Sequence, residues 1–104
     1  MNEDAVFRAL ADASRRRLLD RLHRKNGQTL GDLCEGLDMT RQAVAKHLTI
    51  LKEAGIVTDR KVGRETRNRL NPVPLREIED WLSYYEKFWT TNLQKLDHLL
   101  MEEQ

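Results

Sequence analysis

The spacing of apolar residues changes twice along this chain, and that pattern limits the folds it can adopt. Over residues 6 to 51, apolar side chains recur every three or four positions, as in amphipathic helices. Over residues 56 to 71 the pattern becomes extended, and the helical spacing returns from residue 75 to residue 100. The sequence therefore predicts a mainly helical fold with one small β-hairpin.

Residues with capping chemistry set the expected boundaries of these elements. Asp12, Thr29 and Thr40 each stand just before a helical pattern, where their side-chain oxygens can accept hydrogen bonds from free amides. Gly63 supplies the permissive backbone for the hairpin turn. The expected elements are helices over 3–12, 13–25, 29–38 (with Leu30, Leu33 and Leu37 inward) and 40–55, a hairpin over 56–71, and a long last helix over 75–100.

Charge divides unevenly between the two parts of the chain. The net charge is only +1, yet residues 1–71 carry 15 Lys and Arg against 10 Asp and Glu, whereas residues 72–104 carry 3 against 7. Such a split indicates that the first part meets a polyanion while the tail has another task, such as self-association.

The helix expected over 40–55 has one apolar and one polar face. At about 100° per residue, Val44, Leu48 and Leu51 lie together on the inward side. The opposite side gathers long donors and small residues: Arg41, Gln42, Ala45, Lys46 and Thr49. The helix N-terminus, which Thr40 caps, favours a nearby phosphate. A helix in a DNA major groove needs this combination, because small residues allow close approach and long donors reach bases and phosphates. A face that is merely solvated is the alternative interpretation. His47 lies beside the apolar stripe, where a structural or DNA-contacting role is expected.

A cationic hairpin follows this helix directly. It carries Arg60, Lys61, Arg64, Arg67 and Arg69 within ten residues. Cations on a two-stranded element can lie along a DNA backbone or place an arginine in a minor groove. The short helix, the turn near residues 38–39 and the polar-faced helix before it form a helix-turn-helix.

The ordered combination of these motifs resembles the ArsR family of winged helix-turn-helix transcriptional regulators over essentially the whole chain. "FRALADASRRRLLDRL" resembles the family's two opening helices, "LGDLCEGLDMTRQAVAKHLTILKEAGIV" its helix-turn-helix, and "DRKVGRETRNRLNP" its wing. The resemblance implies one winged-helix domain over 1–104, mainly α, with about five helices and a two-stranded wing. DNA binding is then expected in 13–71, and dimerisation helices in 1–12 and 73–101.

Aromatic residues crowd the last helix beyond what one small core needs. Trp81, Tyr84, Tyr85, Phe88 and Trp89 are of the type enriched at protein interfaces, although they could instead cap the core of a single chain. The family resemblance implies a homodimer whose interface contains Val6, Phe7, Leu10, Trp81, Leu82, Tyr85, Phe88, Trp89 and Leu96. A symmetric dimer would bind a pseudo-palindromic site in double-stranded DNA, with half-sites about 34 Å apart.

The family's metal sites lack their ligands in this sequence. The cysteine pair of its arsenic and lead sensors aligns with Thr29 and Gly31, and Cys34 alone cannot hold a soft metal. The other family site needs two histidines on the last helix, where His98 stands beside Asp97 without a second. We therefore expect neither metal nor cofactor. The last helix looks like that of a metal-free subgroup often encoded beside small START-like (SRPBCC) proteins. This resemblance implies a repressor whose signal is an unknown small-molecule effector, a partner or its own abundance.

Other functions and locations are constrained by what the sequence lacks. It has no phosphate-binding glycine loop and no spaced catalytic constellation, so an enzyme is not expected. A single cysteine, no apolar run near 20 residues and no signal peptide favour a cytoplasmic protein without membrane contact. The expected function is a DNA-binding repressor. The alternatives are a winged-helix module that binds protein, and a repressor that senses redox state through Cys34, whose simpler interpretation is a small buried apolar residue.

Overall fold

The structure, a computed structural model, describes residues 3–102 of the 104-residue chain, and the side chains of Trp89 and Glu102 lie outside that description. The described residues form α1 (Glu3–Leu10), α2 (Ala13–Arg24), α3 (Leu30–Cys34), α4 (Arg41–Glu53), β1 (Val57–Val62), β2 (Glu65–Leu70) and α5 (Val73–Glu102). This order, with an antiparallel pairing of β1 and β2, confirms the winged-helix fold predicted from the sequence.

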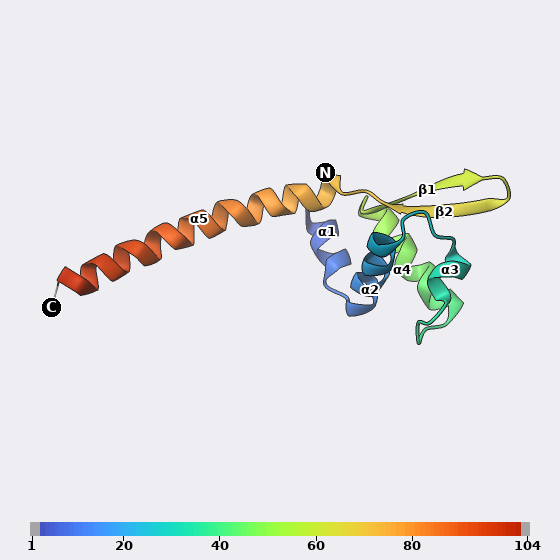
Figure 1. Ribbon diagram of the computed structural model, residues 1–104, viewed down its shortest axis with the longest axis horizontal. Coiled ribbons are helices and arrows are strands. Elements are labelled where there is room, and N and C mark those ends of the chain that lie inside the picture. The colour runs from blue at the N-terminus through green and yellow to red at the C-terminus, as the bar shows by residue number, and fades with distance from the viewer. Residues whose placement is uncertain (1–2, 103–104) are drawn as a thin grey trace.

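Two elements project from a helical body. Helices α1 to α4 lie together, the hairpin extends from one side of them, and α5 runs away on the other (Figure 1). The molecule measures 70 × 28 × 22 Å along its principal axes. Leu75 and Ile78, near the start of α5, pack against the core of the body, whereas most of the described side chains beyond Ile78 are exposed.

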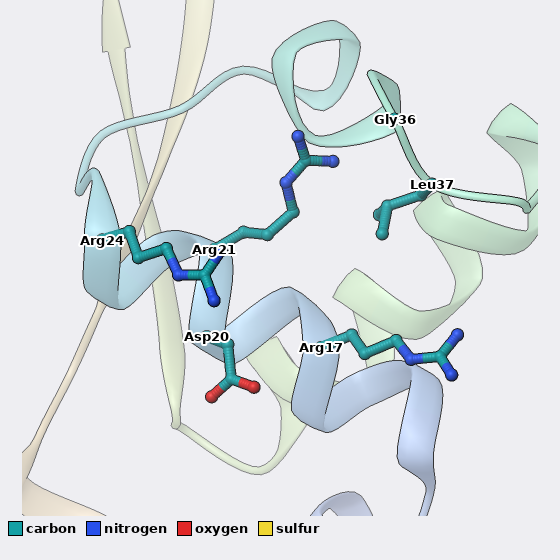
Figure 2. Close-up of a pocket in the computed structure, with 6 residues that line it drawn as sticks. All are labelled: Arg17, Asp20, Arg21, Arg24, Gly36 and Leu37. Atoms are coloured by element: carbon teal, nitrogen blue, oxygen red, sulfur yellow. The ribbon is translucent and has the colours of Figure 1, made fainter.

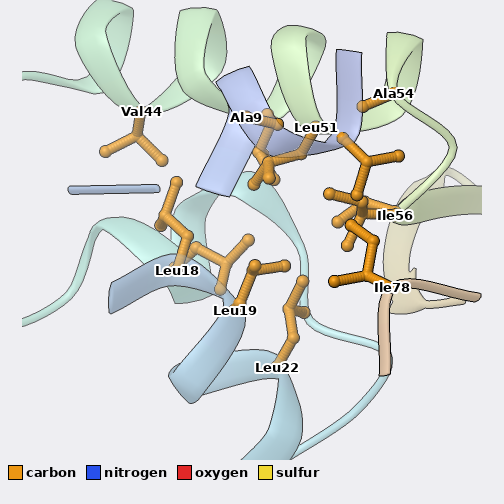
Figure 3. Packing of buried hydrophobic residues seen from close by; sticks show 13 residues of the cluster. Ala9, Leu18, Leu19, Leu22, Val44, Leu51, Ala54, Ile56 and Ile78 are labelled. Carbon is orange, nitrogen blue, oxygen red and sulfur yellow. The ribbon is translucent and has the colours of Figure 1, made fainter. Parts of the chain in front are cut away.

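One apolar core joins the helices of the body to the base of the hairpin (Figure 3). Its buried members are Val6, Ala9, Leu18, Leu19, Leu22, Leu33, Val44, Leu48, Leu51, Ala54, Ile56, Val57 and Ile78. Val6 is fully buried among them. This corrects its placement in a dimer interface, because its side chain is already enclosed within the single chain. Leu10 is half-buried against the same core, and Phe7 remains 38% exposed.

The junction of α1 and α2 is held by polar side chains from the start of α2. Asp12 is the N-cap residue, and its Oδ1 accepts hydrogen bonds from the amides of Ser14 at 2.8 Å and Arg15 at 3.1 Å. Arg15 and Arg16 donate back to the last carbonyls of α1, which have no partner within that helix. The backbone hydrogen bond from Arg15 is the main reason that the pKa of Asp12 lies below its ordinary value of 3.8.

Replacing Asp12 with alanine is expected to lower the melting temperature at neutral pH, because the α2 amides lose their acceptor. The pKa of Asp12 is lower in the folded chain than in the unfolded chain. The ionised carboxylate therefore stabilises the fold fully above about pH 3.8, and this stabilisation is lost as pH falls through the pKa of the folded chain. Thermal unfolding followed by circular dichroism from neutral pH to about pH 2 tests this. Asp12→Asn, which keeps an uncharged acceptor, is the control. A gap between wild type and Asp12→Ala that stays constant with pH would contradict the assignment.

The caps predicted for α3 and α4 are present. Thr29 accepts from the Asp32 amide and Asp32 accepts from the Thr29 amide, both at 3.1 Å, which forms a capping box. The hydrogen bonds from Thr29 lower the pKa of the Asp32 carboxyl, with the backbone bond contributing most. Thr40 accepts from the Ala43 amide at 3.1 Å. Helix α3 ends at Cys34, earlier than predicted, so Leu37 lies in the turn and only its half-buried packing against the core was correctly anticipated.

Helix α4 ends in a Schellman motif that leads into the hairpin. The amide of Ile56 donates to Leu51 O at 3.0 Å and that of Gly55, with φ +79°, donates to Lys52 O at 2.9 Å. Gly63, with φ +65°, occupies the first of the two turn positions between the strands, as in a type II′ turn. The hairpin therefore leaves α4 along a defined path.

A short third segment pairs with the base of the wing. Gln28 and Asn68 form an isolated antiparallel bridge, with Asn68 N donating to Gln28 O at 2.7 Å. The buried Gln28 side chain also donates to Arg21 O and Lys25 O at the end of α2. These bonds attach β2 to α2 as well as to β1.

Helix α5 begins at Val73, two residues earlier than predicted. Pro74 lies in its first turn, where a helix needs no amide donor, so proline does not delay the start. The helix contains 30 residues and spans about 45 Å.

Candidate nucleic-acid interface

The outward face of α4 presents unpaired donors at its N-terminal half. Gln42 and Lys46 are exposed, and neither has a hydrogen-bond or ion-pair partner among the described residues. Thr49, one turn further, is exposed and its hydroxyl donates to Ala45 O at 3.0 Å. Val44, Leu48 and Leu51 are buried on the opposite side, as predicted, and lock the rotation of the helix. The helix that carries this row is fixed in the fold, and the side chains of Gln42 and Lys46 are free to contact a ligand.

The other candidate residues of α4 lie away from the centre of this row. Arg41 is exposed but extends beside α3, with Nη1 4.0 Å from the position that a Cβ at Gly31 would occupy. Ala45 is half-buried and lines a hollow of about 240 Å³ between α4 and the wing. His47 is half-buried on the side facing α2, and its Nδ1 is buried without a hydrogen-bond partner in the described part of the chain. The Asp12 carboxylate is close enough to His47 to interact electrostatically with it.

The pairing of β1 with β2 places the cations of the hairpin on two opposite faces and at the turn. Arg60 pairs with Arg67 and Thr58 with Arg69, so the three arginines lie on one face, which we call the outer wing face. Lys61, one position on from Arg60, lies on the opposite face, which also carries Asp59 and the buried Asn68. Arg64 is at the exposed turn. The sequence grouped these cations as one surface, and the register divides them.

An ion pair connects α4 to the inner wing face, which is the face of the hairpin that carries Asp59, Lys61 and Asn68. Lys52 Nζ lies 2.8 Å from Asp59 Oδ2, with both side chains partly exposed. An exposed pair contributes little stability, so its effect is chiefly on the angle between α4 and the hairpin. Sequence patterns missed this ion pair, because only the three-dimensional path through Gly55 brings the two residues together.

A second group of arginines lies on α2 and does not converge. Arg17, Arg21 and Arg24 line an open pocket of about 280 Å³ together with Asp20, Gly36 and Leu37. Figure 2 shows the guanidinium groups of Arg17, Arg21 and Arg24 lying apart from one another rather than around a common point. Arg21 instead donates to Leu33 O at 2.9 Å and to Glu35 O, which satisfies carbonyls at the end of α3. Arg21 therefore has a structural role in joining α2 to the end of α3.

Helix α5 leaves a broad apolar surface uncovered. Several of its large apolar side chains, with their exposed fractions, are Trp81 at 41%, Leu82 at 52%, Tyr84 at 70%, Tyr85 at 43%, Phe88 at 54% and Leu96 at 51%. Trp81 contacts Phe7 of α1 edge-on, with ring centroids 5.5 Å apart, and Tyr85 at 4.6 Å. Trp81 thus packs on the helical body of its own chain through Phe7, whereas Tyr84 and Phe88 are the more exposed of the described aromatic residues. Trp89, also predicted at the interface, has its side chain outside the described structure.

The positions that could bear on metal or redox sensing have structural roles. Thr29 caps α3, and Cys34 is half-buried against the core, as its interpretation as a small apolar residue expected. Among residues 3–102, no group of three or more His, Cys, Asp and Glu side chains is arranged to hold a metal ion. Within the same range, no helix has the length and apolar character needed to cross a bilayer.

A short helix, a turn and an exposed second helix, flanked by a cationic hairpin, define a winged helix-turn-helix protein. Residues 10–60 match a family model described as a helix-turn-helix domain. The solved structure of an ArsR-like transcriptional regulator from Rhodococcus sp. RHA1 superimposes with a TM-score of 0.84 at 33% identity, covering 95% of this chain and 90% of that one. The chain belongs to the ArsR family of transcriptional regulators.

Two curated relatives agree with that assignment. The HTH-type transcriptional regulator YuzN of Bacillus subtilis is 40% identical over 88 residues, covering 78% of this chain and 96% of the relative. The arsenical resistance operon repressor of Escherichia coli is 34% identical over 96 residues, covering 91% and 79%. These proteins are regulators of transcription, and the match extends well beyond the helix-turn-helix.

Proposed function

We propose that this protein is a sequence-specific repressor that binds double-stranded DNA as a homodimer in the cytoplasm and acts without a metal or catalytic activity. The observation that carries the proposal is the exposed row of Gln42, Lys46 and Thr49 on α4, whose two long side chains have no partner among the described residues. Placed in a major groove, the Gln42 amide can pair with the edge of an adenine and Lys46 with guanine or phosphate. Lys61 and Arg64 of the wing then reach the neighbouring backbone.

Self-association is supported by the uncovered surface of α5. Its half-exposed aromatic and leucine side chains form an uncovered apolar surface, and such surfaces often mark sites of protein association. A second copy is the occupant that the chemistry favours, because a symmetric pair of recognition helices would match two half-sites about 34 Å apart.

Independence from metal is supported by Thr29, which stands where the family's soft-metal sensors have cysteine and whose hydroxyl is engaged in the α3 capping box. If a signal controls the protein, we expect it to be a small molecule, as in the metal-free subgroup. The alternative of a protein-binding module receives no support from α4, because none of the exposed large apolar residues of the described chain lies on that helix.

The test of this function is selection of bound duplexes from a random pool with the purified full chain at physiological salt. An enriched inverted repeat is the expected result, since it requires both base recognition and two-fold symmetry. Binding without any enrichment, decreasing only as salt rises, would identify a nonspecific polyanion binder and overturn the proposal.

Gln42→Ala is expected to weaken binding to the selected site by about 1 to 3 kcal/mol and to relax preference at one base pair. The melting temperature should hardly change, because the side chain is exposed and has no partner in the described chain. Titration of the selected duplex and its single-base variants measures both effects. Gln94→Ala, an equally exposed glutamine on α5, is the matched control. If wild type and Gln42→Ala bind each single-base variant of the duplex with the same affinity, then Gln42 has no part in base recognition.

A further inference from the structure

The hollow between α4 and the wing is formed by a regular stripe of each element. From α4 it is lined at positions i, i+3, i+4 and i+7, which share one side of a helix: Ala45, Leu48, Thr49 and Lys52. From β2 it is lined by Thr66 and Asn68, two positions apart on the inner wing face. We call this space of about 240 Å³ the α4–wing hollow. Its walls are set by the placement of two elements rather than by the position of a single side chain.

Asn68 contributes a hydrogen-bond acceptor that has no partner. The residue is 2% exposed, and its Nδ2 donates to Gln28 O at 3.0 Å. Because a carbonyl oxygen only accepts, this bond fixes which end of the Asn68 amide is the oxygen. Asn68 Oδ1 is then buried without a hydrogen-bond partner among the described residues. A buried acceptor left unpaired costs free energy, so a donor from outside the chain would stabilise this site.

The rest of the lining favours an uncharged ligand with an apolar body. Leu48 is buried and Leu30, at the start of α3, is half-buried, and both line the hollow with alkyl groups. Lys52 is the charged residue of the described lining, and its ammonium is already paired with Asp59 at 2.8 Å. A charged ligand would have to break that pair or lose its hydration without a partner. Since a cavity of about 150 Å³ can hold benzene, the α4–wing hollow has room for one ring with a polar substituent.

We propose that the α4–wing hollow binds a small uncharged molecule with an apolar body and an N–H or O–H donor, and that its occupation weakens DNA binding. The donor bonds to Asn68 Oδ1, and the body of the ligand lies against Leu30 and Leu48. Because Oδ1 is buried, the ligand reaches it when the inner wing face and α4 separate slightly. The ligand therefore selects a more open arrangement of the helix and the hairpin.

The same separation changes the surface that would read DNA. Ala45 and Thr49 line the hollow and also belong to the outward side of α4, and the ion pair of Lys52 with Asp59 joins that helix to the wing. This part of the inference rests on the proposed function, because it requires that α4 and the wing contact DNA together. By linkage, a bound duplex must then weaken ligand binding by the same factor by which the ligand weakens duplex binding.

The binding test titrates the isotope-labelled full chain with phenol, benzyl alcohol and benzamide, and with toluene, which has the shape of phenol but no donor. The Asn68 Nδ2 signals and the backbone amide signals of Ala45 and Thr49 report binding. Thr66→Tyr fills the hollow from an exposed position that lines it. Thr58→Tyr, at an exposed position on the outer wing face of the same hairpin, is the matched control. Tyrosine suits a strand, so both variants should fold.

At least one donor-bearing probe is expected to shift the Asn68 Nδ2 signals of wild type and of Thr58→Tyr to saturation, but not those of Thr66→Tyr. The site is overturned if none of these probes shifts those signals, which would leave water as the partner of Oδ1. It is also overturned if toluene binds as tightly as phenol, a comparison that needs no variant. Binding to Thr66→Tyr as tight as to wild type, or shifts confined to α5, would place the ligand elsewhere and overturn it too.

The regulatory test titrates the selected duplex with and without a saturating concentration of the probe that binds. We expect the affinity of wild type and of Thr58→Tyr to fall about 5-fold or more with the probe, and that of Thr66→Tyr not to respond to it. A bound probe that leaves duplex affinity unchanged would overturn the coupling to DNA. Failure of the proposed function is distinguishable, because it would appear as a wild-type chain without sequence preference. The probe titrations contain no DNA and would still decide whether the hollow binds a ligand.

Discussion

Replacing Leu82 and Leu96 with glutamate is expected to produce a monomer and to lower affinity for a two-half-site operator by about 10²- to 10⁴-fold. Both leucines lie on α5 and are about half exposed, at 52% and 51%, so the fold of a single chain does not require them. In a dimer each glutamate would bury an unpaired charge, which opposes association strongly. Loss of the second recognition helix then removes the affinity that comes from binding two linked half-sites.

The width of the apolar arc on α5 gives the reason to expect a partner there. At about 100° per residue, the apolar side chains of α5 cover about 180° of the helix circumference. Tyr84 and Leu93 lie at the two edges of this arc, and Ile78 lies between them. An amphipathic helix that packs on one neighbour needs an apolar stripe of about 100°. Only Leu75 and Ile78 of this arc pack against the core of the described chain. The remainder can be covered by a second copy of α5 and by the adjacent α1.

Sedimentation velocity gives the mass of the glutamate variant, and titrations with a full operator and a single half-site give its affinity. Thr90→Glu/Gln94→Glu adds the same two charges on the polar side of α5, where both residues are exposed, and should remain dimeric. A variant that stays dimeric with glutamate at 82 and 96 would place the interface elsewhere. A monomer that bound the full operator as tightly as wild type would show that dimerisation does not contribute to affinity.

Helix positions in the body were largely predictable because their determinants are local. Asp12, Thr29 and Thr40 cap the helices that they precede, and Gly63 makes the predicted turn. The inward stripe of α4 was also correct, since a regular helix fixes which residues share a side. This local information was enough to predict the helix-turn-helix and the wing, and the resemblance of the ordered motifs indicated the family.

The parts that failed depend on residues distant in sequence. Spacing alone could not decide whether the apolar Val6 faces the core or a partner, because both require the same pattern. The division of Arg60 from Lys61 follows from strand pairing, in which a shift of one residue exchanges the two faces. Arg41 was grouped with the outward face of the helix, although at 100° per residue its position is nearer the inward stripe and brings it beside α3.

Leu51→Ala is expected to lower the free energy of unfolding by about 2 to 5 kcal/mol, a large share of the roughly 5 to 15 kcal/mol of a typical domain. Leu51 is fully buried, and its side chain packs from α4 into the core formed with Leu18, Leu22 and Ile56 (Figure 3). Removing it leaves a cavity in a close-packed region. The melting temperature should fall by roughly 10 °C or more at a fixed protein concentration.

The same change should leave sequence preference intact at a temperature where the variant is folded, because Gln42 and Lys46 lie on the opposite side of α4. Leu51→Met, which nearly conserves volume, is the control and should cost less than about 1.5 kcal/mol. Thermal unfolding measures stability, and titration of single-base operator variants measures base preference. Both are performed on Leu51→Ala, Leu51→Met and Gln42→Ala, so that the effects of the two faces of α4 are measured separately. Loss of base preference in folded Leu51→Ala would show that the core and the DNA-reading row are coupled. If Leu51→Ala keeps its base preference and Gln42→Ala keeps its melting temperature, then the core and the DNA-reading row act independently.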